Sequence, residues 1–108
     1  MENALKDIIK HTIVDAELHL VRCVERGSFT EANTAKGYLN GLRDYSEHMD
    51  WKDGGDSLLR YKTVAEEGLK RAIKFTDYGR AAFWHSYLSA WEVAETMHAK
   101  SQEEAQDE

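Results

Sequence analysis

The sequence predicts an all-α protein, a compact antiparallel helical bundle of four main helices, and three observations support this fold class. Apolar residues recur at three- and four-residue spacing along almost the whole chain, and the two-residue alternation of strands is missing. The 108 residues include no proline, the residue that most often breaks helices. Apolar residues make up 42% of the chain, which supplies a core and excludes wholesale disorder.

Residues 3–26 are predicted to form the first helix, with Asn3 as its N-cap and Gly27 as its C-terminal stop. One side of this helix carries a main apolar stripe, predicted to face the core: Leu5, Ile9, Ile13, Ala16, Leu20, Cys23 and Val24. A second apolar stripe of Val14, Leu18 and Val21 falls on the opposite side. A helix with two apolar sides is buried on both, so either the other helices surround it or a second chain contacts it.

Residues 30–49 are predicted to form the second helix, capped by Ser28 or Thr30. Its predicted core side consists of Ala32, Ala35, Leu39, Leu42, Ser46 and Met49. The opposite side carries Thr34, Gly37, Gly41 and, further along the helix, His48. Two glycines inside a helix cost about 2 kcal/mol relative to alanine, and close approach of another helix would offset that cost. The alternative is a pair of tolerated glycines on a solvated face.

Residues 57–75 are predicted to form the third helix, after a loop that contains Gly54 and Gly55. Its predicted inward side is Leu58, Tyr61, Val64, Ala65, Leu69, Ala72 and Phe75. After a turn at 76–79, residues 80–100 form the fourth helix, with Phe83, Trp84, Tyr87, Ala90, Trp91, Ala94 and Met97 inward. Short connections favour antiparallel neighbours. We find no internal repeat, and expect one domain over 1–100 with an acidic tail at 101–108.

The charge and cysteine content limit the classes of partner. The net charge of −6 argues against direct nucleic-acid binding, which rests on Lys and Arg. The longest apolar run is too short for a bilayer, so no membrane association is expected. A single cysteine and a charged N-terminal stretch favour a reducing, cytoplasmic setting without a signal peptide.

A polar ladder on the first predicted helix is the weak candidate for a metal site. Asp7, His11, Asp15 and His19 are spaced by four residues, so their side chains lie along one face. Carboxylate and imidazole groups can bind a divalent metal, but the Glu-x-x-His pattern of helical di-metal proteins is missing. The alternative is a solvated face with Asp–His pairs. We expect no cofactor and no catalytic residue, with Cys23 as a core residue.

The second helix also carries a resemblance to a known class of proteins. The run from Thr30 to Asp44, with the pattern EA…KGxxxGLR, resembles a helix in small helical proteins encoded by tailed bacteriophages. The resemblance covers about fifteen residues and implies an accessory or virion-associated protein, in the host cytoplasm or the virion, that works through protein–protein contacts.

These patterns lead to one leading hypothesis about function and two alternatives. The leading hypothesis is a non-catalytic interaction protein, an oligomeric assembly or virion-associated component. The predicted partner interface, with a protein partner or a homo-oligomer, consists of Val14, Leu18, Val21, Thr34, Gly37, Gly41 and His48. The first alternative is a small acidic inhibitor that blocks a host nucleic-acid enzyme or defence protein. The second is a small helical metal- or nucleotide-dependent enzyme.

Overall fold

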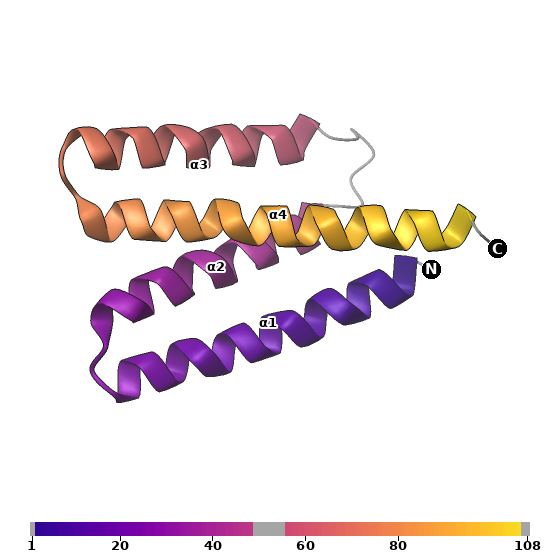
Figure 1. Ribbon diagram of the computed structural model, residues 1–108, viewed down its shortest axis with the longest axis horizontal. Helices are drawn as coiled ribbons and strands as arrows, with labels where there is room; N and C mark the ends of the chain where they lie inside the picture. Colours follow the sequence, from indigo (N-terminus) through magenta and orange to yellow (C-terminus); the bar gives the residue numbers. More distant parts are fainter. Residues whose placement is uncertain (1, 49–55, 107–108) are drawn as a thin grey trace.

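The chain folds into four helices, which confirms the predicted all-α bundle. The computed structural model describes residues 2–48 and 56–106, and it describes side-chain surroundings for residues 5–48 and 58–100. The helices are α1 (Glu2–Glu25), α2 (Phe29–His48), α3 (Asp56–Lys74) and α4 (Tyr78–Gln106), packed side by side (Figure 1). The predicted loop around Gly54 and Gly55 lies outside the described residues.

The α1–α2 and α3–α4 turns have the same backbone design. The amides of Gly27 and Ser28 donate hydrogen bonds to carbonyls in the last turn of α1, at 3.0 and 2.9 Å. The amides of Thr76 and Asp77 repeat this pattern at the end of α3, at 3.1 and 2.8 Å. Gly27 and Thr76 both have positive φ, 73° and 53°. Both helices therefore end in a Schellman motif. The motif requires a residue with positive φ, a conformation that glycine adopts freely and threonine does not.

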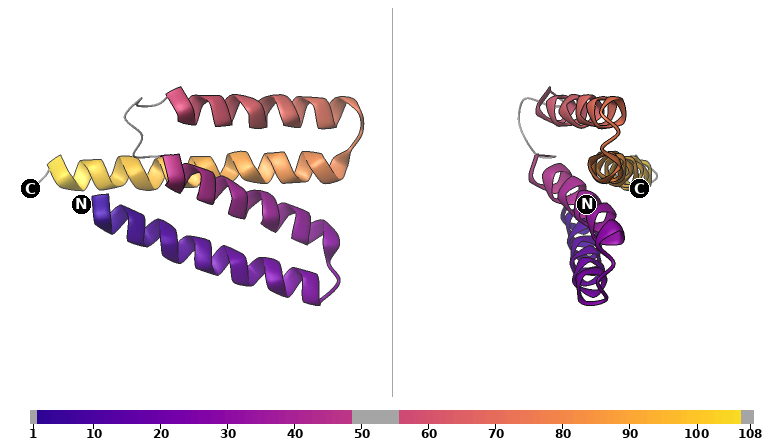
Figure 2. Two further views of the ribbon diagram at one scale, coloured as in Figure 1. Left: turned by 180° about the vertical axis from the view of Figure 1, so that it is seen from behind. Right: turned by 90° about the vertical axis from the view of Figure 1, so that its left-hand side faces the viewer.

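Helices α2 and α4 form the centre of the bundle. Helix α1 packs on the outer side of α2, and α3 packs on the outer side of α4, as both views in Figure 2 show. Within the described residues α1 and α3 do not touch each other. The molecule is consequently flattened, with extents of 47 × 30 × 20 Å. The alternative in which the other three helices surround α1 is wrong, because α1 is an outer helix.

The two central helices run parallel and approach closely at the glycines of α2. Gly37 lies against the backbone of Phe83, and Gly41 lies against Tyr87. A Cβ atom at Gly37 would stand 2.9 Å from the carbonyl carbon of Phe83, and one at Gly41 would stand 2.6 Å from the carbonyl oxygen of Tyr87. In an up-and-down bundle α2 and α4 are diagonal neighbours. The missing side chains let this diagonal pair touch, and the contact holds α1 and α3 apart.

This contact corrects the predicted role of the glycine side of α2. Gly37 and Gly41 do receive another helix, but that helix is α4 of the same chain, so neither a separate partner nor a solvated face is right. His48 is also buried inside the chain, where its ring stacks on Tyr61 of α3 with centroids 4.6 Å apart. Helix α2 is buried on two sides, by α1 and by α4.

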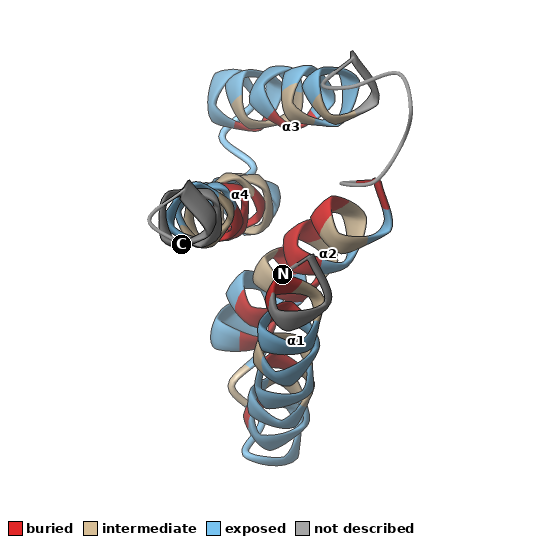
Figure 3. Ribbon diagram, turned by 90° about the vertical axis from the view of Figure 1, so that its right-hand side faces the viewer, coloured by how far each residue is buried: buried red, intermediate tan, exposed pale blue. Residues whose placement is uncertain are grey.

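The core follows the α2–α4 contact, as the buried stretches in Figure 3 show. Its larger cluster draws on all four helices: Leu5, Ile9, Tyr45, Ala65, Tyr87, Trp91 and Ala94. A smaller cluster consists of Ala16, Leu39, Leu42 and Ala90. The rings of Tyr45 and Trp91 meet edge to face at a centroid distance of 5.4 Å, a favoured geometry for an aromatic pair. Most side chains predicted to face inward from α1, α2 and α4 are at least half-buried.

Helix α3 is the main departure from the predicted core. Val64 and Phe75 were expected inward but are 58% and 68% exposed. Helix α3 packs on α4 and barely contacts α2, so the apolar side of α3 is wider than the surface that α4 covers. On α1, Val24 is likewise half exposed.

Helix α4 continues to Gln106, into the segment predicted as an acidic tail. Over the described residues, every helix is too short or too polar to cross a membrane.

Candidate interaction surfaces

The outer α1 stripe, defined as Val14, Leu18 and Val21, stays at the surface of the chain. These side chains are 52%, 50% and 50% exposed. They point away from α2, because Ala16 and Cys23 on the other side of the helix are buried. A contiguous row of half-exposed aliphatic side chains favours association with another apolar surface. The structure thus leaves this part of the predicted partner interface available.

The outer α1 stripe has the spacing of a coiled-coil seam. Positions 11, 14, 18, 21 and 25 alternate in steps of three and four, with the aliphatic residues in the middle and His11 and Glu25 at the ends. In heptad terms, the flanking positions hold two charges of each sign: Lys10, Asp15, Glu17 and Arg22. Glu17 accepts a hydrogen bond from the guanidinium of Arg43 at 2.7 Å, and this ion pair is about half exposed.

The Asp/His ladder lies along the surface of α1. Asp7, His11, Asp15 and His19 are all exposed. Among the residues that the structure describes, no group of three or more His, Cys, Asp or Glu side chains is arranged to hold a metal ion. The ladder is thus a row of exposed side chains on α1, and metal binding by it stays a prediction.

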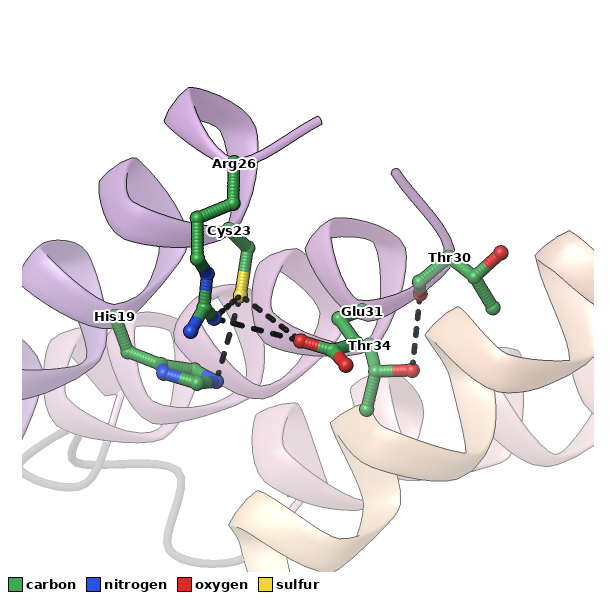
Figure 4. A network of polar contacts seen from close by, with 6 residues as sticks. All are labelled: His19, Cys23, Arg26, Thr30, Glu31 and Thr34. Atoms are coloured by element: carbon green, nitrogen blue, oxygen red, sulfur yellow. Dashed lines mark hydrogen bonds and ion pairs between the residues drawn. The ribbon is translucent and has the colours of Figure 1, made fainter. Parts of the chain in front are cut away.

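Cys23 is fully buried, as expected for a core residue, but its sulfur has polar neighbours that the sequence did not indicate. The Nε2 atom of His19 and a guanidinium nitrogen of Arg26 both lie 3.7 Å from the sulfur, and a carboxylate oxygen of Glu31 lies 3.9 Å from it (Figure 4). Arg26 also pairs with Glu31 at 3.5 Å across the α1–α2 turn. These contacts link the end of α1 to the start of α2.

The flattened bundle leaves a groove between α1 and α4, over α2. It encloses about 350 Å³ and is lined by Thr12, Asp15, Ala16, His19, Thr34, Ala35, Tyr38 and Ser86. Thr34, predicted at the partner interface, is exposed and its hydroxyl donates to the carbonyl of Thr30 at 3.4 Å. The groove thus brings Thr34 close to Asp15 and His19, the C-terminal half of the Asp/His ladder.

A second groove, here named the aromatic groove, opens between α2 and α3 over α4. It encloses about 410 Å³ and is lined by Asn40, Asp44, Tyr61, Val64, Phe83, Trp84 and Tyr87. The ring of Trp84 meets Phe83 and Tyr87 edge to face, at centroid distances of 4.9 and 5.5 Å. Sequence reasoning placed the aromatic residues of α4 inward but gave Asp44 no role. In the sequence, Asp44 is marked only by its position one turn after Gly41.

The Tyr87 phenol anchors this groove. Its hydroxyl donates a hydrogen bond of 2.6 Å to a carboxylate oxygen of Asp44. Burial raises the pKa of the Tyr87 phenol well above its usual value, and the hydrogen bond to Asp44 and its negative charge raise it further. Burial also raises the pKa of Tyr45, whose hydroxyl lies 3.0 Å from Nδ1 of His98. Both phenols therefore stay protonated well above neutral pH.

Comparisons with protein-family models, curated proteins and solved structures found no significant match to this chain. The resemblance of residues 30–44 to phage proteins stays a prediction.

Proposed function

We propose that this chain is a non-catalytic interaction protein that associates with a second copy of itself through the outer face of α1. The observation that carries the proposal is the outer α1 stripe, a half-exposed aliphatic row on a helix at the edge of the bundle. Aliphatic side chains give affinity for another apolar surface and offer no reactive group. The proposed role is that of a component in a larger protein assembly.

The charges beside the stripe favour a second copy as the occupant. In a parallel pair of helices, each g position faces the e position five residues later on the partner helix. Lys10 then faces Asp15 of the second copy, and Glu17 faces Arg22 of the second copy. Both contacts pair opposite charges, and two-fold symmetry forms each of them twice. Glu17 can exchange its half-exposed partner Arg43 for this contact.

The pairing is expected to be reversible. The seam has three aliphatic residues, with His11 and Glu25 at its ends, so it is shorter than the three or four heptads of a stable coiled coil. The molar mass in solution should therefore rise with protein concentration.

Leu18→Glu tests the proposal by placing a charge at the centre of the seam. Because Leu18 is half exposed, the variant should keep its helicity and urea midpoint but stay monomeric where the unchanged protein dimerises. Sedimentation velocity over a concentration series measures the mass, and circular dichroism checks the fold. Leu59→Glu is the matched control, because Leu59 is 62% exposed on α3, away from the seam. Loss of dimer in both variants, or in neither, contradicts the proposal.

A charge exchange tests the parallel register. Lys10→Glu alone should weaken the dimer, because it places two acids face to face, and adding Asp15→Lys should restore it. A double variant that pairs no better than Lys10→Glu would rule out this register.

A further inference from the structure

We propose that the aromatic groove binds the side chain of an arginine presented by a basic peptide. This site is separate from the outer α1 stripe, and it does not depend on whether the chain dimerises. Its residues come from α2, α3 and α4, whereas the outer α1 stripe lies on the far side of α2. A cavity of about 410 Å³ lies within the usual range for a bound small group.

Asp44 gives the groove its preference for a cation. One of its carboxylate oxygens accepts the hydrogen bond from Tyr87, and none of the ion pairs among the described residues includes Asp44. The side chain is half-buried beside aromatic rings, where a carboxylate without a counter-charge is unfavourable. A cation entering the groove would supply the missing charge.

The groove walls add a second reason for a cation. Tyr61, Phe83, Trp84 and Tyr87 line the cavity, and the faces of aromatic rings attract cations. Trp84 is half-buried and lines the cavity. An anion would meet the charge of Asp44, and a neutral apolar ligand would cover that charge without compensating it. The walls and the carboxylate together therefore select a positive group with an apolar body.

Guanidinium suits this geometry better than ammonium. A guanidinium is planar, stacks on aromatic rings and donates two parallel hydrogen bonds to a carboxylate, whereas ammonium is a compact and strongly hydrated charge. The neighbouring groove of about 290 Å³ shares Val64 and Trp84 but contains Arg71 and Arg80. Glu67 also lines that groove and Arg80 pairs with Asp77 at 3.4 Å, so the two arginines are partly balanced there, and the preference for the other end rests on Asp44 itself.

The test compares two small probes on the unchanged protein. Nα-acetyl-arginine methylamide and its citrulline counterpart have similar shapes, but citrulline is neutral. In titrations followed by NMR of the indole NH groups, the arginine probe should shift the Trp84 resonance saturably. The citrulline probe should bind about tenfold more weakly or worse, as expected for the loss of a charge-assisted hydrogen bond. Trp84→Phe assigns the resonance among the three tryptophans. Equal affinities for the two probes, or no saturable shift, would overturn the proposal.

Asp44→Asn provides the second arm. The amide keeps an acceptor for the Tyr87 hydroxyl but removes the charge, so affinity for the arginine probe should fall about tenfold. Glu47→Gln is the matched control, because Glu47 is an exposed acid on the same helix that does not line the groove. Unchanged affinity in a folded Asp44→Asn protein overturns the proposal. The two-probe comparison decides the question alone if this variant does not fold.

Discussion

Replacing Gly37 by alanine tests the close contact between α2 and α4 most directly. On an isolated helix this change would stabilise by about 1 kcal/mol, because alanine is the better helix former. In the bundle the new methyl group would meet the carbonyl group of Phe83, with its carbon 2.9 Å away and its oxygen closer still. Ordinary van der Waals contact begins at 3.4 Å. The obstacle is backbone, so no side-chain rotation relieves it and α4 has to move.

The size of the effect follows from these two opposing contributions. Forcing an extra methyl group into a packed contact costs about 1–3 kcal/mol, and more when backbone has to shift. The gain in helix propensity offsets about 1 kcal/mol of that. We expect Gly37→Ala to lower the free energy of unfolding by about 2 kcal/mol, which corresponds to a fall in melting temperature of roughly 10 °C for a domain of this size.

Urea unfolding followed by far-ultraviolet circular dichroism measures this change. Gly79→Ala is the matched control, since Gly79 lies in the first turn of α4. A Cβ atom there would stand 3.3 Å from the flexible end of Asn33, so this variant should be as stable as the unchanged protein or gain up to about 1 kcal/mol. A Gly37→Ala protein as stable as its parent would refute the reasoning, because α2 and α4 could then not be in backbone contact.

Two further predictions concern stability. Thr76 ends α3 with φ of 53°, a conformation that costs an L-residue about 1–2 kcal/mol and glycine little. Thr76→Gly should therefore raise the free energy of unfolding by about 1 kcal/mol, which a higher urea midpoint would show. A lower midpoint would contradict this prediction. The raised pKa of Tyr87 means that the folded protein keeps a proton that the unfolded chain releases near pH 10. Its contribution to stability is full below about pH 10 and is lost as the pH rises above that value. Urea midpoints measured across this range should fall more steeply in the unchanged protein than in Tyr87→Phe, and equal slopes would count against it.

The helices and their ends were largely predictable from local sequence. The period of the apolar residues, the missing proline and the stop at Gly27 set four helices with bounds close to those observed. Such signals depend on residues a few positions apart, which interact within one helix or turn. The end of α3 was also predicted to within one residue, but residue type did not indicate that Thr76 adopts the conformation that glycine takes at Gly27. The shared design of the two turns was therefore not visible as a sequence repeat.

The arrangement of the helices was decided by tertiary structure. The sequence showed that α1 and α2 each have two sides suited to packing, but not which helix covers each side. Only the tertiary structure shows that α4 of the same chain packs against Gly37 and Gly41, whereas Leu18 stays at the surface. The aromatic groove likewise joins Asp44 to Tyr87, 43 positions later. Periodicity reports how many sides of a helix are apolar, but the choice of partner depends on the fit between surfaces distant in the chain.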